Sequence, residues 1–324
     1  MPNANVDRKN PKRCASSGSD YSLMEFMREW PDDDACLTWL WVNRFAEDGK
    51  HAECPKCEQV REFKRYKTAQ RRQSWTCSAC GHHIQPTAGT IFEGSSTSLQ
   101  LWFYAIHVMT STRCGVSAKA LERELGVTYK TAWRMFNLIR NELMAQDDEP
   151  LAGEVEIDET SVDGKPRKHY RLSQDPEALS KAHKLRERSR ATVYAAVERG
   201  GRIKATVMES RRGPALKQQA IQWIVPNAVV YTDEWPAYNG LSLHFSAHSR
   251  VRHSSGEYVI GGTHTNTIEG FFGNLKTGIR GNYKKVSHKW LQGYLNEYTF
   301  RYNHRHRGER SMFETLLLRA AAGH

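Results

Sequence analysis

The pattern of apolar and polar residues changes along the chain, from a helical period in its first half to a strand period in its second. Between Tyr21 and Asp48, apolar residues recur at helical spacing, and Pro31 predicts a break between two short helices. A third, strongly apolar helix is predicted over residues 98–113, after a linker-like segment at 94–97. The first half is therefore predicted to be mainly helical, apart from one turn-rich stretch.

Residues 117–143 predict two more helices, joined by a turn at Gly126. The hydroxyl groups of Ser117 and Thr128 are suited to cap the first and the second helix. A unit of this size is typical of a helix-turn-helix, whose second helix meets base edges near its N-terminus. An ordinary helical packing module is the alternative. The basic residues that would face DNA in the first case are Lys130 and Arg134.

After an acidic, proline-containing boundary at residues 146–150, the pattern becomes that of strands. Residues 154–159 alternate between apolar and polar, and β-rich runs at 191–198 and 202–209 flank a glycine pair as in a hairpin. The remaining predicted elements are a strand at 228–233 and helices at 214–224, 265–278, 287–303 and 311–321. We therefore expect an α+β chain of several domains, with a mixed sheet in its second half.

The charge balance points to a polyanionic partner. Of 324 residues, 47 are Lys or Arg and 36 are Asp or Glu, which gives a net charge of +11 with His neutral. Nucleic acid is the simplest such partner. No apolar run is long enough to cross a membrane, and the polar residues 1–20 lack the apolar core of a secretory signal. We therefore expect a cytoplasmic protein without a membrane-spanning segment.

Four of the seven cysteines form two Cys-x-x-Cys pairs. The first pair is Cys54 and Cys57, the second is Cys77 and Cys80, and 19 residues separate them. Four thiolates at this spacing suit tetrahedral Zn²⁺. Because four sulfurs fill the coordination sphere, the predicted site is structural rather than catalytic. Four chance buried thiols, or a redox pair, are the alternatives.

The segment between the cysteine pairs is basic and contains aromatic residues. From Lys56 to Arg72 it has seven basic and two acidic residues. Such a hairpin can follow a phosphate backbone, although a solvated hairpin face would have the same composition. The residues predicted to contact DNA are Lys64, Arg65, Arg71 and Arg72.

Three acidic residues lie where a metal-dependent site could form. Asp158 ends the alternating strand, Asp233 ends the short apolar strand, and Glu269 lies early in a predicted helix. Carboxylates at strand ends and on a helix can meet at one edge of a mixed sheet, and their oxygens suit Mg²⁺. Solvated surface acids are the alternative. The competing acids on the first strand are Glu154, Glu156 and Glu159. Glu154 and Glu156 share one face with Asp158, so strand alternation alone does not choose among these three.

The helix that carries Glu269 also carries cations. Lys276 lies seven residues after Glu269 and Arg280 eleven, close to the same helix face. A carboxylate for metal followed by cations for DNA suits phosphoryl transfer. Farther along, the spacing of Trp290, Tyr294, Tyr298 and Tyr302 favours packing. Arg301, Arg305 and Arg307 are better DNA candidates, and His253 and His264 are expected to be hydrogen-bonding supports rather than ligands.

Several segments, taken in this order, resemble bacterial insertion-sequence DDE transposases with a zinc ribbon and an integrase-like catalytic domain. The segments that carry the resemblance are the zinc ribbon, TSVDG after EIDE, VYTDEWPAYNG, HTNTIEGFFGNLKTGIRG and YLNEYTFRYNHR. The group that they resemble is insertion-sequence family fifteen-ninety-five. The resemblance covers residues 20–310 and depends on the order and separation of these motifs.

The resemblance implies a ribonuclease-H-like catalytic domain with a metal triad at Asp158, Asp233 and Glu269, and it thereby selects Asp158 over its strand neighbours. Lys276 matches the basic residue that follows the third acid. Two Mg²⁺ or Mn²⁺ ions are implied as cofactors, with cleavage at transposon ends and transfer of the 3′-OH to target DNA. The implied partner is double-stranded DNA, as terminal inverted repeats and as target. Two ends need two active sites, which implies a homodimer or a larger synaptic complex at the nucleoid.

The predicted organisation is a flexible tail at 1–20, N-terminal helices at 21–50, the zinc ribbon at 51–93, the helix-turn-helix region at 94–146 and the catalytic domain at 147–324. A basic insertion at 165–190, with nine basic and three acidic residues, is expected to contact DNA or to be a solvated loop. Two other functions stay open. One is a non-catalytic zinc-ribbon DNA-binding regulator, and the other is a ribonuclease-H-fold nuclease that cuts without joining.

Overall fold

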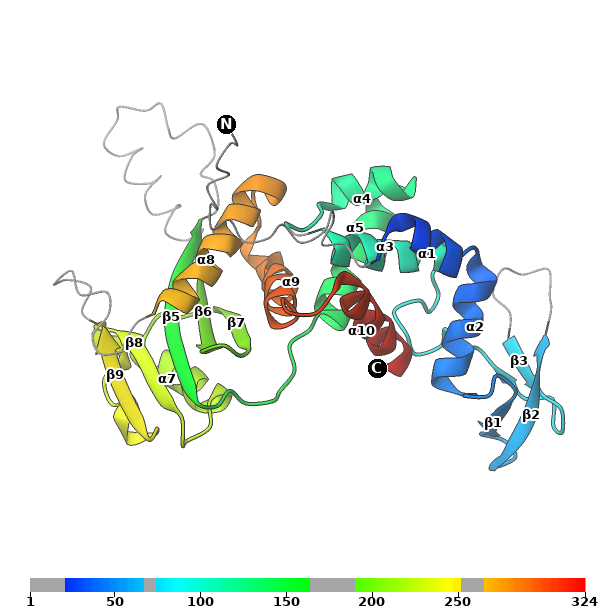
Figure 1. Cartoon of the computed structure of the whole chain (residues 1–324), viewed down its shortest axis with the longest axis horizontal. Coiled ribbons are helices and arrows are strands. Elements are labelled where there is room, and N and C mark those ends of the chain that lie inside the picture. The colour runs from blue at the N-terminus through cyan, green and yellow to red at the C-terminus, as the bar shows by residue number, and fades with distance from the viewer. Residues whose placement is uncertain (1–20, 67–73, 113, 164–189, 252–264, 324) are drawn as a thin grey trace, which may run out of the picture.

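The computed structural model of the chain describes residues 21–66, 74–112, 114–163, 190–251 and 265–323. These residues form a mixed α/β structure with a four-stranded and a five-stranded sheet. The smaller sheet lies at one end of the molecule and the larger sheet toward the other, with helices between them (Figure 1). In the described ranges, no helix combines the length and the apolar character that a membrane crossing requires.

The described residues of the N-terminal half form five α-helices. They are α1 (Leu23–Glu29), α2 (Asp33–Arg44), α3 (Leu99–Ser111), α4 (Ala118–Leu125) and α5 (Tyr129–Leu138). The side chain of Asp32 accepts a hydrogen bond from the Ala35 N–H at the start of α2, and Ser98 does the same at the start of α3. The predicted break at Pro31 and the helix over 98–113 are confirmed.

Helices α4 and α5 meet at Gly126, whose φ of 64° lies in the left-handed region that favours glycine. Ser117 caps α4 through a 3.1 Å hydrogen bond from the Ala120 N–H, and Thr128 caps α5 in the same way. The predicted pair of helices is therefore confirmed. Helix α5 continues into a π-helical turn, η1 (Ile139–Leu143).

The smaller sheet is antiparallel throughout. Its strands are, in order, β1 (His51–Cys54), β2 (Gln59–Tyr66), β3 (Ser74–Cys77) and β4 (His83–Ile84). Trp75 of β3 stacks on Trp41 of α2, with ring centroids 4.8 Å apart and planes within 9° of parallel. The sheet is therefore fixed to the N-terminal helices by apolar packing.

The larger sheet has the order β7-β6-β5-β8-β9. Its strands are β5 (Glu154–Asp163), β6 (Arg190–Glu198), β7 (Ile203–Met208), β8 (Val229–Asp233) and β9 (Ala247–Val251). Strands β5, β6 and β7 pair antiparallel, whereas β8 is parallel to both β5 and β9. The predicted β6–β7 hairpin is confirmed. Strand β9 was not predicted, because only one of its five residues is buried and its sequence carries no clear alternation.

Asp158 lies within β5 and not at its end, so this detail of the prediction was wrong. The strand continues beyond residue 159 because its pairing with β6 extends to Asp163 opposite Arg190. The residues that follow Glu159 include Thr160 and Val162, whose β-branched side chains suit a strand.

Helices cover both faces of the larger sheet (Figure 1). They are α7 (Gly213–Trp223), α8 (Asn266–Gly278) and α9 (Leu291–Asn303). The last described helix, α10 (Glu309–Ala322), lies against the N-terminal helices instead. Tyr194 and Ala196 of β6 join the core beneath α7, whereas Val193, Ala195 and Val197 join the core shared with α8 and α9. Helix α10 packs on α2 and α3, so the C-terminal segment returns to the N-terminal helices.

A fully buried ion pair connects the two halves of the chain. Arg140 of η1 donates to Glu297 of α9, and the exposed fractions of the two side chains are 1% and 0%. Although burial alone would raise it, the pKa of Glu297 is lowered by Arg140 and Arg301. The rings of Phe136 and Tyr294 lie 3.5 Å and 3.8 Å from the Arg140 guanidinium carbon, so the cation is also covered by aromatic faces.

We predict that Glu297→Gln lowers the free energy of unfolding by about 3–5 kcal/mol, because it leaves the buried Arg140 charge uncompensated. Urea unfolding followed by circular dichroism measures the change. Glu314→Gln, which removes the carboxylate from an exposed pair with Arg310, is the matched control and is expected to have little effect. Equal effects of the two substitutions would show that the buried pair does not stabilise the junction.

Candidate functional site

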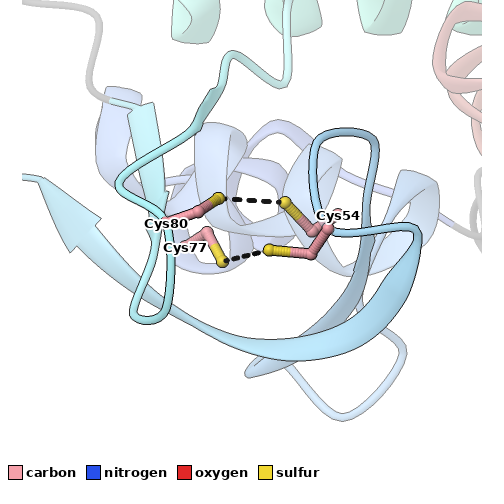
Figure 2. Close-up of side chains that lie close together, drawn as sticks. Cys54, Cys77 and Cys80 are labelled. Atoms are coloured by element: carbon pink, nitrogen blue, oxygen red, sulfur yellow. Dashed lines mark hydrogen bonds between the residues drawn. The ribbon is translucent and has the colours of Figure 1, made fainter.

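The four cysteines of the two Cys-x-x-Cys pairs come together at the base of the smaller sheet. Cys54 ends β1 and Cys77 ends β3, and each pair closes a tight turn that exposes its sulfurs to the other pair. The Sγ atoms of Cys54 and Cys80 are 3.6 Å apart, and those of Cys57 and Cys77 are 4.0 Å apart (Figure 2). All four Sγ atoms lie within 4.8 Å of one another, so the cluster could hold a zinc ion.

The donor set of this cluster fits zinc. Burial raises the pKa of Cys77, but hydrogen bonds from the backbone N–H groups of Cys80 and Ala79 and from neighbouring thiols lower it to about 7. Gly81 has a φ of 72°, which lets the second turn close behind Cys80. The neighbouring His83 lies outside the cluster and is hydrogen-bonded to Ser74 and Thr76.

The second candidate site lies on the larger sheet, where β5, β8 and α8 meet. Strands β5 and β8 are parallel, with Glu154 opposite Val229 and Glu156 opposite Tyr231. The same offset of 75 residues, continued by two positions, sets Asp158 level with Asp233. Both side chains are half-buried, whereas Glu269, in the first turn of α8, is exposed.

The charges of these carboxylates act on one another. Burial and the negative charges of Glu159, Asp233 and Glu269 raise the pKa of Asp158 to about 7, against a lowering by its hydrogen bond from the Glu159 N–H. Asp158, Asp233 and Glu269 are therefore close enough for their charges to influence one another. Among the described residues, the cysteine cluster is the one group of three or more side chains whose ligand atoms already lie close enough together to hold a metal ion.

Glu156 holds the helix that carries Glu269. Its side chain is fully buried and accepts hydrogen bonds from the backbone N–H groups of Thr267 and Ile268, at 3.0 Å and 3.1 Å. These N–H groups belong to the first turn of α8, where backbone N–H groups have no acceptor within their own helix. Glu156 also pairs with Arg199 of the β6–β7 turn at 3.0 Å. The sequence did not reveal this role, because its partners lie 43 and 111 residues away.

The three acids that compete with Asp158 on β5 are each bound to an arginine. Glu154 and Glu156 both pair with Arg199, and Glu159 pairs with Arg211. Glu159 also accepts a hydrogen bond from the buried Tyr238 hydroxyl. These three carboxylates are therefore held by cations of the protein itself.

The predicted DNA-contacting residues fall into two groups. Lys130 and Arg134 are exposed on α5, Lys64 is exposed on β2, Arg280 is exposed after α8, and Lys276 is half-buried in the last turn of α8. Arg65 instead binds Asp34 at 2.6 Å and lies over the Trp75 ring, so its side chain is occupied within the protein. Arg71 and Arg72, most of the 165–190 insertion, and His253 and His264 lie outside the described residues.

The aromatic residues near the C-terminus pack as predicted, with one exception. Tyr294 and Tyr298 are buried and Tyr302 is half-buried, whereas Trp290 is 36% exposed. Arg301, predicted as a DNA contact, instead pairs with Glu297 and donates to the backbone carbonyl groups of Met109 and Thr112. Its side chain is therefore part of the junction between the halves.

Comparisons with known proteins place this chain among transposition proteins. Residues 150–303 match a family model described as the ISXO2-like transposase domain. The chain is also 30% identical over 264 residues to a protein of Halobacterium salinarum described as an uncharacterized protein in transposable element ISH50. That match covers 76% of this chain and 84% of the relative, so the similarity extends beyond the larger sheet and its helices.

We predict that Cys54→Ser releases bound zinc, because a tetrahedral thiolate site loses one of its four ligands. Metal content per chain, measured by atomic absorption, is expected to fall from one zinc toward zero. Cys114→Ser, at an exposed cysteine outside the cluster, is the control that keeps its zinc. One zinc per chain in the Cys54→Ser variant would refute the assignment.

We also predict a pH-dependent effect of Asp158→Asn when no divalent ion is added. The pKa of Asp158 is raised from 3.8 to about 7, so the folded state binds more protons than the unfolded state between these values. Stability contributed by the protonated carboxyl is therefore lost as pH rises through this window. The variant should unfold at higher urea concentration than the wild type at about pH 8 and at the same concentration below about pH 4. The exposed Glu47→Gln serves as control, and a constant difference across pH would contradict the raised pKa.

Proposed function

The chain belongs to the ISXO2-like transposase family, and from this premise we propose that it is a DDE-type DNA transposase. It would bind insertion-sequence ends, cleave them and join the 3′-OH to target DNA. The observation that carries the proposal is the placement of Asp158 and Asp233 level with each other on parallel strands, with Glu269 acting on the same carboxyl. A transposase role in general follows from the family itself.

The proposed catalytic domain has a ribonuclease-H-like fold. The order β7-β6-β5-β8-β9, with three antiparallel strands followed by two parallel ones, supports this assignment. So do the helices on both faces of the sheet. In this arrangement the central strand β5 and its parallel neighbour β8 supply two of the acids, and α8 supplies the third.

The three carboxylates fit a divalent-metal site. Asp158, Asp233 and Glu269 offer only oxygen ligands, which suit Mg²⁺ or Mn²⁺, and their mutual repulsion favours a cation between them. Two bound ions would supply a nucleophile from water or a 3′-OH and stabilise the leaving oxygen of the phosphodiester. Glu156 would position α8 for this site, since it binds the first turn of the helix through two backbone N–H groups. Glu159, held by Arg211 and Tyr238, would support Asp158 from the next position on the strand.

The basic residues would hold DNA around this site. Lys276 and Arg280 follow Glu269 along α8 and its extension, so that they would position a DNA end beside the carboxylates. Lys130 and Arg134 on α5, together with the zinc ribbon and Lys64, would recognise the terminal inverted repeats. Because two ends must be cut and joined, the working form would be a homodimer or a larger synaptic complex at the nucleoid.

We predict that Asp233→Asn abolishes strand transfer while end binding is retained. Loss of a metal ligand removes several kcal/mol of transition-state stabilisation. The rate of strand transfer is therefore expected to fall by a factor of about a thousand or more. The assay supplies a pre-cut insertion-sequence end with a free 3′-OH, a target plasmid and Mg²⁺, and measures joined product and end binding in parallel. The neighbouring Glu234→Gln is the matched control that keeps activity, since its carboxylate is exposed.

The same assay separates the two other functions. Wild-type protein that binds ends but neither cuts nor joins them would be a DNA-binding regulator. Wild-type protein that cuts ends but gives no joined product from the pre-cut end would be a nuclease. Either result would refute the proposed transposase activity.

We predict that Lys276→Ala weakens binding to end DNA and lowers the slope of log K against log salt by about 1, because one phosphate contact is lost. Fluorescence anisotropy over a series of salt concentrations measures both quantities. Lys217→Ala provides a comparison, since Lys217 is also half-buried but lies on α7, on the opposite face of the sheet. An unchanged slope in Lys276→Ala would remove Lys276 from the DNA contact.

A further inference from the structure

An aromatic groove lies where the helix pair α4–α5 meets the segment 282–290 that follows α8. Its volume is about 500 Å³, within the range of sites that bind small organic groups. Tyr129, Trp133 and Trp290 form a row along it: Tyr129 stacks on Trp133 at 6.3 Å, and Trp133 meets Trp290 edge-on at 5.6 Å. Tyr129 is 48% exposed and Trp290 is 36% exposed, so the row is open to a ligand.

Cations lie at both ends of this row. The Lys119 Nζ is 5.8 Å from the centre of the Tyr129 ring, and the Lys289 Nζ is 4.8 Å from that of the Trp290 ring. Lys285 also lines the groove, and none of the described lining residues is acidic. Lys119 also pairs with Glu122. Lys289 lies over the Trp290 ring, and Lys285 is part of the groove lining, so both bring positive charge to this groove. The groove therefore combines flat aromatic faces with positive charge.

The floor of the groove is fixed by the junction between the two halves of the chain. Tyr283 and Tyr294 line it and also cover the buried guanidinium of Arg140. Asn282 donates to the backbone carbonyl groups of Cys114 and Gly115. Gly115 has a φ of 80°, and a Cβ there would overlap the Tyr283 hydroxyl, so the close approach requires glycine. The groove is consequently formed before any ligand arrives.

We propose that this groove binds an unpaired nucleotide of single-stranded DNA. Its base would stack on Trp290 and Tyr129, and its phosphate would lie at Lys285 and Lys289. Exposed aromatic side chains interleaved with lysines are the combination that binds single strands, because every base has a flat face and every linkage a negative charge. The proposal rests on the proposed function. It adds a binding site for a DNA strand that has separated from its duplex, and this site lies between α5 and the segment that follows α8.

The test compares binding of single-stranded and duplex DNA by Trp290 variants. A 15-nucleotide oligothymidylate with one central 2-aminopurine reports stacking by fluorescence quenching, and labelled duplex of the insertion-sequence end reports end binding by anisotropy. We expect Trp290→Ala to weaken binding of the single strand at least about fivefold and to reduce the quenching. Trp290→Phe should retain most of both, and duplex binding should change little in either variant.

Two further variants guard against a loss of folding and against general charge effects. Lys289→Gln, at an exposed residue, is expected to weaken single-strand binding while leaving the base quenching of the bound complex intact. Tyr66→Ala removes an aromatic side chain of similar exposure, 50%, from the zinc ribbon and should leave single-strand binding unchanged. Thermal unfolding of each variant verifies that it is folded.

Each outcome decides between the claims. Equal single-strand binding and quenching in wild type and Trp290→Ala would overturn the groove proposal. The same result is expected if the groove binds a protein segment and not DNA. If wild type still joins a pre-cut end to target in that case, the proposed transposase function stands. If wild type binds the single strand through Trp290 but joins no ends, the groove stands and the proposed catalytic function fails.

Discussion

Arg140 and Glu297 impose the constraint on which the arrangement of the two halves depends. Each charge is buried, and without Glu297 the Arg140 charge would be uncompensated, since an isolated ion in the interior costs several kcal/mol. Arg140 follows directly from α5, and Glu297 lies on α9, which packs on the larger sheet. The pair therefore stabilises the observed placement of the helices proposed to read DNA relative to the sheet proposed to cut it. The aromatic groove is built on the same residues, so recognition, groove and sheet share one rigid junction.

A second buried carboxylate has the same role within the acidic site. Glu156 is paired with Arg199 on one side and bound to the first turn of α8 on the other. This arrangement fixes the helix that carries Glu269 beside the strands that carry Asp158 and Asp233. Glu154 and Glu159 are also held by arginines, whereas burial and neighbouring negative charges raise the pKa of Asp158. The acids that support the structure can thus be told apart from those suited to bind cations by the groups that each contacts. Their position along the strand does not distinguish them.

The parts of this architecture that depend on local sequence were predictable. The cysteine spacing, the caps at Ser117 and Thr128, and the β6–β7 hairpin follow from short-range rules. The parts that depend on distant partners were not. Alternation could not distinguish Asp158 from Glu156, because the partners of Glu156 lie on other elements. Likewise Arg65 and Arg301 lie in basic segments typical of DNA-binding surfaces, yet each pairs with an acid of the protein itself. The extension of β5 past Glu159 depended on β6, which is distant in the sequence.

The central claim is that Asp158, Asp233 and Glu269 share bound divalent ions. The most direct measurement replaces Mg²⁺ by Fe²⁺ and adds ascorbate and peroxide, so that hydroxyl radicals formed at the ion cut the polypeptide within a short distance of it. Mass spectrometry then locates the cuts. The account predicts cuts clustered around residues 158, 233 and 269, which disappear when excess Mg²⁺ competes for the site. Cuts confined to other segments, or cuts at these three that excess Mg²⁺ does not suppress, would contradict it.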